Sequence, residues 1–115
     1  MDFPRDQLEE LKRLYSGVQR SDEGGFTFFL LPDVALPDGC SPSRADLLLC
    51  PMLRDGYPSR LFIAERVTSS ANPNWNGPFR ILDRNWHVFS WMADQNDQND
   101  LRLAQMVALH MGGLR

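Results

Sequence analysis

The chain has 115 residues, of which 43% are hydrophobic, and a formal net charge of -3 at pH 7. This length and composition predict one globular domain over residues 1–115 and exclude a chain that is disordered throughout. Lys12 is the only lysine and the arginines are scattered, so the clustered positive charge typical of nucleic-acid-binding proteins is missing.

The N-terminus and the cysteines indicate where the protein works. Residues 1–6 include charged side chains and precede no apolar stretch, which is not the pattern of a secretory signal. No window approaches the roughly 18 apolar residues of a membrane span. The two cysteines, Cys40 and Cys50, stand in no CxxC pair. We therefore expect a cytoplasmic protein with reduced thiols.

The first predicted element is a helix over residues 4–16. Asp2 is a candidate N-cap, Gly17 is a candidate C-terminal stop, and Glu9 and Arg13 are spaced to form an ion pair across one turn. Apolar side chains recur every three or four residues and share one face: Leu8, Leu11, Leu14 and Tyr15.

Antiparallel strands are expected next, because apolar and aromatic segments alternate with short turns rich in Gly, Pro and Asp. The predicted strands cover residues 18–20, 26–31, 44–50 and 60–67. Three consecutive leucines, Leu47 to Leu49, indicate a strand that is covered on both faces.

The second half of the chain is expected to contain a long loop and a helix. Residues 68–78 form the longest irregular segment, a frequent place for function in a small domain. Residues 86–92 alternate as an extended segment. A C-terminal helix, capped by Asp97 or Asp100, is expected to run to about Met111, with His110 in the last turn, where a positive charge is favourable. The prediction is an α+β fold: N-terminal helix, four-stranded antiparallel meander, long loop and C-terminal helix.

A set of short motifs occurs in a particular order along the chain. They are Gly24-Gly25-Phe26-Thr27, Leu31-Pro32-Asp33, Leu36-Pro37-Asp38-Gly39, Ala45-Asp46-Leu47-Leu48-Leu49 with Pro51, Gly56-Tyr57-Pro58, Arg84-Asn85-Trp86 and Ser90-Trp91. This order resembles the ubiquitin-conjugating (UBC) fold and its inactive RWD and UEV relatives. It is most similar to the prokaryotic UBC-like family E of bacterial ubiquitin-like modifier operons.

The resemblance implies a pseudoenzyme. Conjugating enzymes follow their Tyr-Pro turn with His-Pro-Asn and then the catalytic cysteine. Here Asn72-Pro73-Asn74 takes the tripeptide position, Arg80 falls near the thiol position, and no cysteine follows Cys50. The implied partners are a ubiquitin-like modifier, including tandem forms, a ThiF-like activating enzyme and a JAB-type isopeptidase.

Two surfaces are candidates for binding such partners. One is the segment after residue 68, with Trp75 expected as an exposed recognition aromatic, whereas Trp86 and Trp91 are expected in the core. Its candidate residues are Asn72, Asn74, Trp75, Asn76 and Arg80. The other is the polar face of the first helix, which in active relatives docks the activating enzyme; its residues here are Glu9, Lys12 and Arg13.

The reactive side chains point to no cofactor or metal. Cys50 is expected to pack as a small hydrophobe and Cys40 to be accessible after a turn. His87 and His110 are expected to be structural, because no nucleophile is evident beside either. Two histidines and two cysteines at scattered spacings do not form a zinc signature.

Three hypotheses remain open at this point. The first is a non-catalytic UBC-like protein that binds a ubiquitin-like modifier or its activating enzyme. The second is an active conjugating enzyme whose nucleophile is displaced to Cys40, or to Cys50. The third is an unrelated small α+β protein-binding module or toxin–antitoxin component, which a sheet other than the four-stranded meander would favour.

Overall fold

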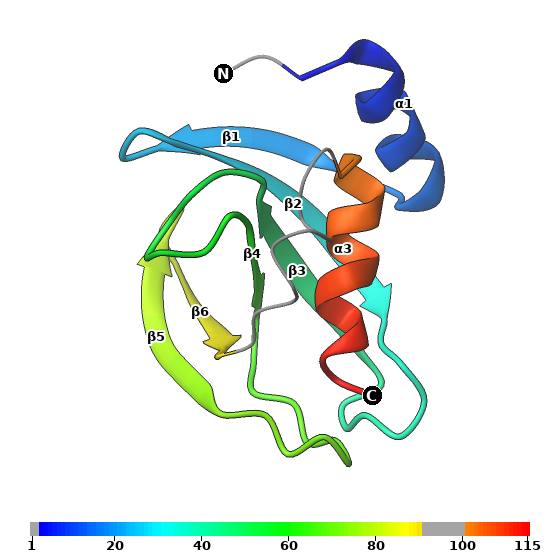
Figure 1. Cartoon of the computed structure of the whole chain (residues 1–115), viewed down its shortest axis with the longest axis vertical. Coiled ribbons are helices and arrows are strands. Elements are labelled where there is room, and N and C mark those ends of the chain that lie inside the picture. The colour runs from blue at the N-terminus through cyan, green and yellow to red at the C-terminus, as the bar shows by residue number, and fades with distance from the viewer. Residues whose placement is uncertain (1–2, 91–100) are drawn as a thin grey trace.

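The computed structural model describes residues 3–90 and 101–115. These residues form a six-stranded antiparallel sheet in the order β1-β2-β3-β4-β6-β5 and two helices (Figure 1). The elements are α1 (Arg5–Leu14), β1 (Gln19–Glu23), β2 (Phe26–Ala35), β3 (Arg44–Cys50), β4 (Arg60–Ile63), β5 (Trp75–Ile81), β6 (Arg84–Phe89) and α3 (Leu103–Gly112).

The predicted four-stranded meander is wrong, because β5 and β6 extend the sheet. They form a hairpin that joins the sheet through β6, where Ile63 pairs with His87. Gly77 and Pro78 favoured a loop in the sequence. β5 accommodates them because it is an edge strand with a register shift between Asn76 and Phe79, and edges and bulges are the places where a sheet tolerates proline.

Several predicted boundaries also change. β2 runs past Pro32 to Ala35, with a register shift between Leu31 and Val34, and β4 ends at Ile63 instead of residue 67. β3 has the predicted bounds, Arg44–Cys50. Predictions for Asp2, Trp91, Met92, Asp97 and Asp100 fall outside the described residues.

Helix α1 is shorter than predicted and forms a different ion pair. Pro4 occupies the N-cap position without a side-chain cap. The Nε of Arg5 lies 3.1 Å from Oε1 of Glu9, so Glu9 pairs one turn back along the helix and not with Arg13. Gly17 follows the helix with φ +78°, a conformation that glycine adopts at low cost.

The alternation of side chains along the strands produces two cores on opposite faces of the sheet. Leu47 and Leu49 of β3 belong to the first core, which α1 and α3 cover through Leu11, Leu103 and Val107. Leu48 and Cys50 belong to the second core. The second core lies on the face away from both helices, and its other members are Phe28, Phe62, Ile81, Trp86 and Val88.

The second core is closed by the curvature of the sheet and by residues 51–59. The Leu82 N–H donates to Glu23 Oε2 at 2.9 Å, which joins the β5–β6 turn to β1; Figure 1 shows the sheet curving between these ends. The guanidinium of Arg54 lies over the rings of Phe26, Phe28 and Phe62 at 4.6, 5.6 and 5.5 Å. A cation over several rings covers apolar surface that neither α1 nor α3 reaches.

None of the helices that the structure describes is long and apolar enough to cross a membrane.

We expect Arg54→Ala to lower the free energy of unfolding by about 2 kcal/mol, because the ring contacts and the packing of the aliphatic stem are lost together. Urea unfolding measures this change. Arg5→Ala is the matched control, since it removes only the exposed pair with Glu9, and it should leave stability nearly unchanged. Equal effects of the two substitutions would contradict the assigned role of Arg54.

His110 lies in the last turn of α3 and has a structural role, as predicted, because it links α3 to the start of β4. It is buried and neutral there, however, and does not supply the positive charge that the helix end favours. It is 7% exposed, and its Nε2 lies 2.9 Å from the Oγ of Ser59. Burial, together with the charge of Arg60, lowers the pKa of His110 to about 4, because removal from water disfavours the imidazolium. The side chain is therefore neutral at pH 7.

The depressed pKa of His110 makes folding sensitive to acid. The unfolded chain binds this proton below about pH 6.5, whereas the folded chain binds it only near pH 4. The contribution of His110 to stability is therefore full above pH 6.5 and falls by about 3 kcal/mol as the pH drops to 4. We expect His110→Gln to flatten the stability profile between pH 6.5 and 4.5 in urea titrations. The same slope in both proteins would contradict this assignment.

Candidate functional site

Both thiols are buried, on opposite faces of the sheet. Cys40, which the sequence predicted to be accessible, is 8% exposed and packs in the first core. Its Sγ lies 4.0 Å from the carbonyl oxygen of Leu114. Cys50 packs in the second core as predicted, with its Sγ 3.8 Å from the Met52 carbonyl oxygen. The sheet therefore separates the two sulfurs.

Burial raises the pKa of both the Cys40 and the Cys50 thiol. Acyl transfer through a thioester needs a thiolate, which a water-excluded environment disfavours. Neither side chain has the access or the ionisation that the displaced-nucleophile hypothesis requires.

We expect both cysteines to resist iodoacetamide in the native protein at pH 8 and to react in urea. Mass spectrometry counts the added groups and locates them by peptide mapping. Rapid native labelling of either cysteine would contradict the burial described here.

The predicted recognition aromatic, Trp75, is a packing residue. Its Nε1–H donates to the Val67 carbonyl oxygen at 3.0 Å, and its ring meets the Phe89 ring edge-on at 5.5 Å. The prediction of an exposed Trp75 is wrong, since the side chain is half-buried. Trp86 lies in the second core as predicted, and its Nε1–H donates to the Ile81 carbonyl oxygen.

The other predicted loop residues spread along the β5 side of the molecule. Asn72 and Asn74 are exposed before the strand, and Asn72 has φ +48°. Asn76 donates to the Oγ of Ser90 at 2.6 Å, which ties β5 to the end of β6. Arg80 is exposed on the strand. Of the five predicted binding residues, Asn72 and Trp75 line a small hollow of about 190 Å³ together with Arg66 and Ser69.

The polar face of α1 is exposed as expected. Glu9, Lys12 and Arg13 all face solvent, and α1 packs on the first core through Leu11. Arg102, at the N-cap of α3, contacts Asp6 and Glu10 at 2.9 and 3.0 Å and ties the two helices together. Lys12 also borders a hollow of about 140 Å³, whose other lining residues are Leu8, Leu11, Val18, Arg20 and Phe29. Glu9 and Arg13 belong to an ordinary solvated helix surface.

The histidines and carboxylates do not converge on a metal centre. Within residues 3–90 and 101–115, no group of three or more His, Cys, Asp or Glu side chains is placed to hold a metal ion. His87 lies on β6, and its buried Nδ1 has no hydrogen-bond partner in the same part of the chain. The structural role predicted for His87 stays a prediction.

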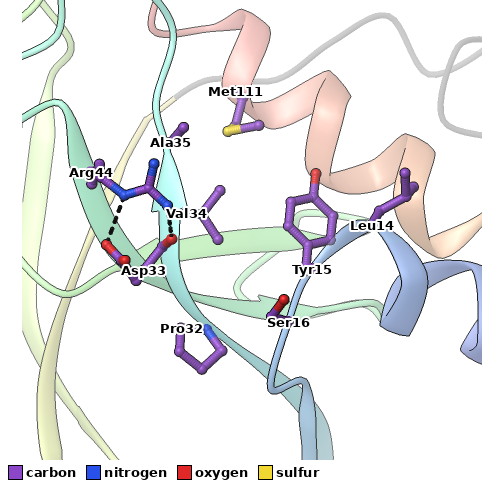
Figure 2. A pocket seen from close by; sticks show the side chains of 9 residues that line it. All are labelled: Leu14, Tyr15, Ser16, Pro32, Asp33, Val34, Ala35, Arg44 and Met111. Atoms are coloured by element: carbon purple, nitrogen blue, oxygen red, sulfur yellow. Dashed lines mark hydrogen bonds and ion pairs between the residues drawn. The ribbon is translucent and has the colours of Figure 1, made fainter.

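A groove of about 680 Å³ that the sequence did not reveal lies between the end of α1, the second half of β2 and the end of α3 (Figure 2). It is our candidate site. Its lining residues are Leu14, Tyr15, Ser16, Pro32, Asp33, Val34, Ala35, Arg44 and Met111. Leu14 is 61% exposed, although the helical spacing placed it on the core face. Burial raises the pKa of Tyr15, so its phenol is neutral at pH 7.

The groove exists because β2 is longer than β1. The two strands pair only from Phe26 to Leu30, whereas β2 continues beside β3 to Ala35. At the register shift, Asp33 has φ +49°. Its N–H donates to Oδ1 of Asp46 at 2.7 Å, and its carboxylate pairs with Arg44 at 2.9 Å. These contacts hold the bulge and set one wall of the groove.

Comparison with protein-family models, with curated proteins and with solved structures finds no match to this chain. The resemblance to the prokaryotic UBC-like family therefore stays a prediction from the sequence motifs, and the fold supports no assignment to the conjugating enzymes.

Proposed function

We propose that this chain is a non-catalytic protein-binding domain that receives its partner at the groove between α1, β2 and α3. The proposal is based on a contrast between the thiols, which catalysis would need, and the apolar side chains of the groove, which binding would need. Both thiols are buried, whereas the groove is open and lined by the exposed Leu14 together with Tyr15 and Met111. Exposed apolar side chains beside a concave surface are typical of interaction sites.

The sequence motifs favour a particular pathway for this binding. Their order supports a ubiquitin-like modifier or its ThiF-like activating enzyme as the partner, in a cytoplasmic pathway that also includes a JAB-type isopeptidase. In this proposal the chain positions its partner and carries no thioester.

The six-stranded sheet favours a second candidate, a protein-binding module unrelated to the conjugating enzymes. The predicted meander had four strands, and the β5–β6 hairpin departs from it. The groove has the same role under both candidates, so binding at the groove and membership of the pathway are tested separately.

We expect the chain to form a noncovalent complex with a modifier or activating enzyme encoded by neighbouring genes, measured by isothermal titration calorimetry. Leu14→Glu should weaken this complex at least about tenfold, because it places a charge on the apolar wall. Leu53→Glu is the matched control. Leu53 is also exposed, at 67%, but it lies in the segment over the opposite face of the sheet and should leave the affinity unchanged.

Incubation with activating enzyme, ATP and modifier separates the three hypotheses. A reductant-sensitive adduct that Cys40→Ala abolishes would establish an active conjugating enzyme and refute the proposal. If the chain binds neither the modifier nor the activating enzyme, the proposed pathway is refuted and the unrelated binding module is the remaining hypothesis.

A further inference from the structure

The second half of β2 has one edge that no strand among the described residues uses. The β1–β2 pairing ends where Gln19 meets Leu30, and the groove begins at Pro32. On the other side, β2 stays paired with β3, with Val34 opposite Ala45 and Ala35 opposite Arg44. The groove therefore runs along an open strand edge and not along a side-chain surface alone.

The hydrogen-bond pattern fixes which backbone groups face the groove. The Leu36 N–H donates to the Ser43 carbonyl oxygen at 2.8 Å, so Leu36 bonds toward β3. In an antiparallel ladder, alternate residues direct their N–H and C=O groups to the same neighbour. Ala35 therefore directs both of its groups away from β3, toward the open edge.

The neighbours of Ala35 offer little to a pairing strand. Pro32 and Pro37 have no N–H, and the Pro37 carbonyl oxygen accepts from the Cys40 N–H at 3.2 Å. The Asp33 N–H donates to Asp46 Oδ1 and the Asp33 carbonyl oxygen accepts from Arg44. Ala35 is thus the position on this edge with a donor and an acceptor both directed outward.

We infer that the groove takes an extended, uncharged segment of a partner protein, which pairs with Ala35 and adds a short strand to β2. Strand addition uses main-chain hydrogen bonds for attachment and side-chain pockets for selection. The N–H and C=O of Ala35 can form two hydrogen bonds with the C=O and N–H of one residue in an extended partner segment. The inference rests on the proposed binding function and specifies the kind of segment that is bound.

The lining of the groove argues for apolar, uncharged side chains on that segment. Among the described residues that line the groove, Asp33 is the one acidic and Arg44 the one basic residue; they pair with each other at 2.9 Å, so this part of the lining has no net charge. Figure 2 shows this pair at one side of the groove and Tyr15, Leu14 and Met111 around the rest. A charged side chain would lose hydration there without gaining an opposite charge.

The test uses a phage-displayed library of random dodecapeptides selected against the full chain. We expect enrichment of uncharged sequences with alternating apolar residues. For a selected peptide, Ala35→Pro should weaken binding at least tenfold in isothermal titration calorimetry, because it removes the outward N–H without touching the β2–β3 ladder. Ala35→Ser is the matched control: it keeps the N–H and nearly the same size, and it should change the affinity less than threefold.

A second measurement does not depend on the folding of the Ala35→Pro variant. In the unmodified chain, the Ala35 amide should shift in ¹H–¹⁵N spectra and become protected from hydrogen exchange when the peptide is added. No enrichment, equal binding by the proline variant, or an unperturbed Ala35 amide would each overturn the inference. A dimer in sedimentation velocity that Ala35→Pro abolishes would also overturn it, in favour of a second copy of this chain.

The same variants distinguish this inference from the proposed function. A modifier or activating enzyme that Leu14→Glu releases but Ala35→Pro does not would overturn strand pairing and leave groove binding intact. Selected peptides that still pair at Ala35, without any binding of those two proteins, would support strand pairing and remove the pathway.

Discussion

Strand β3 is buried on both of its faces, and the rest of the structure follows from that constraint. Leu47, Leu48, Leu49 and Cys50 have no solvent exposure, so each face of the sheet needs its own cover. Two helices supply the first. For the second, the sheet has to curve and residues 51–59 have to close over it, because a chain of this size has limited material with which to build a core.

The burial of both faces of the sheet also explains why neither thiol is available for chemistry. One cysteine contributes to each core, and the raised pKa of both thiols is a consequence of packing. Arg54 contributes to the second cover by lying over three rings, and Arg60 holds the same segment through its 2.8 Å contact with Asp55. The arginine side chains thus act here through the packing of their apolar stems and planar guanidinium groups on the rings, as well as through their charge.

The sequence predicted the parts of this fold that depend on local pattern. The consecutive leucines indicated a strand covered on both sides, and the bounds of β3 were right. Gly17 does adopt a positive φ, but the helix already ends at Leu14, so this glycine is not its C-terminal stop. The failures over burial and over the sheet share a cause: they depend on contacts between distant residues. Cys40 is buried beside the carbonyl of Leu114, and Trp75 is held by Phe89. No spacing within the chain reveals that β5 is an edge strand, where its glycine and proline are tolerated. The groove was missed because Leu14 continues the apolar spacing of α1, which predicts a core residue. The sequence does not show that β1 stops pairing at Leu30, so that no described strand covers the second half of β2 beneath Leu14.

The bulge in β2 has a consequence for how copies of this protein behave when crowded together. An uninterrupted free edge is a template on which identical chains stack into fibrils. Here, prolines on either side of Ala35 and the kink at Asp33 limit that template to a single rung. An edge this short suits the reversible binding of one short segment that we infer above. It is too short for continuous strand pairing from one copy of the protein to the next. The exposed part of the β2 edge is therefore too short to act as a template for fibril growth.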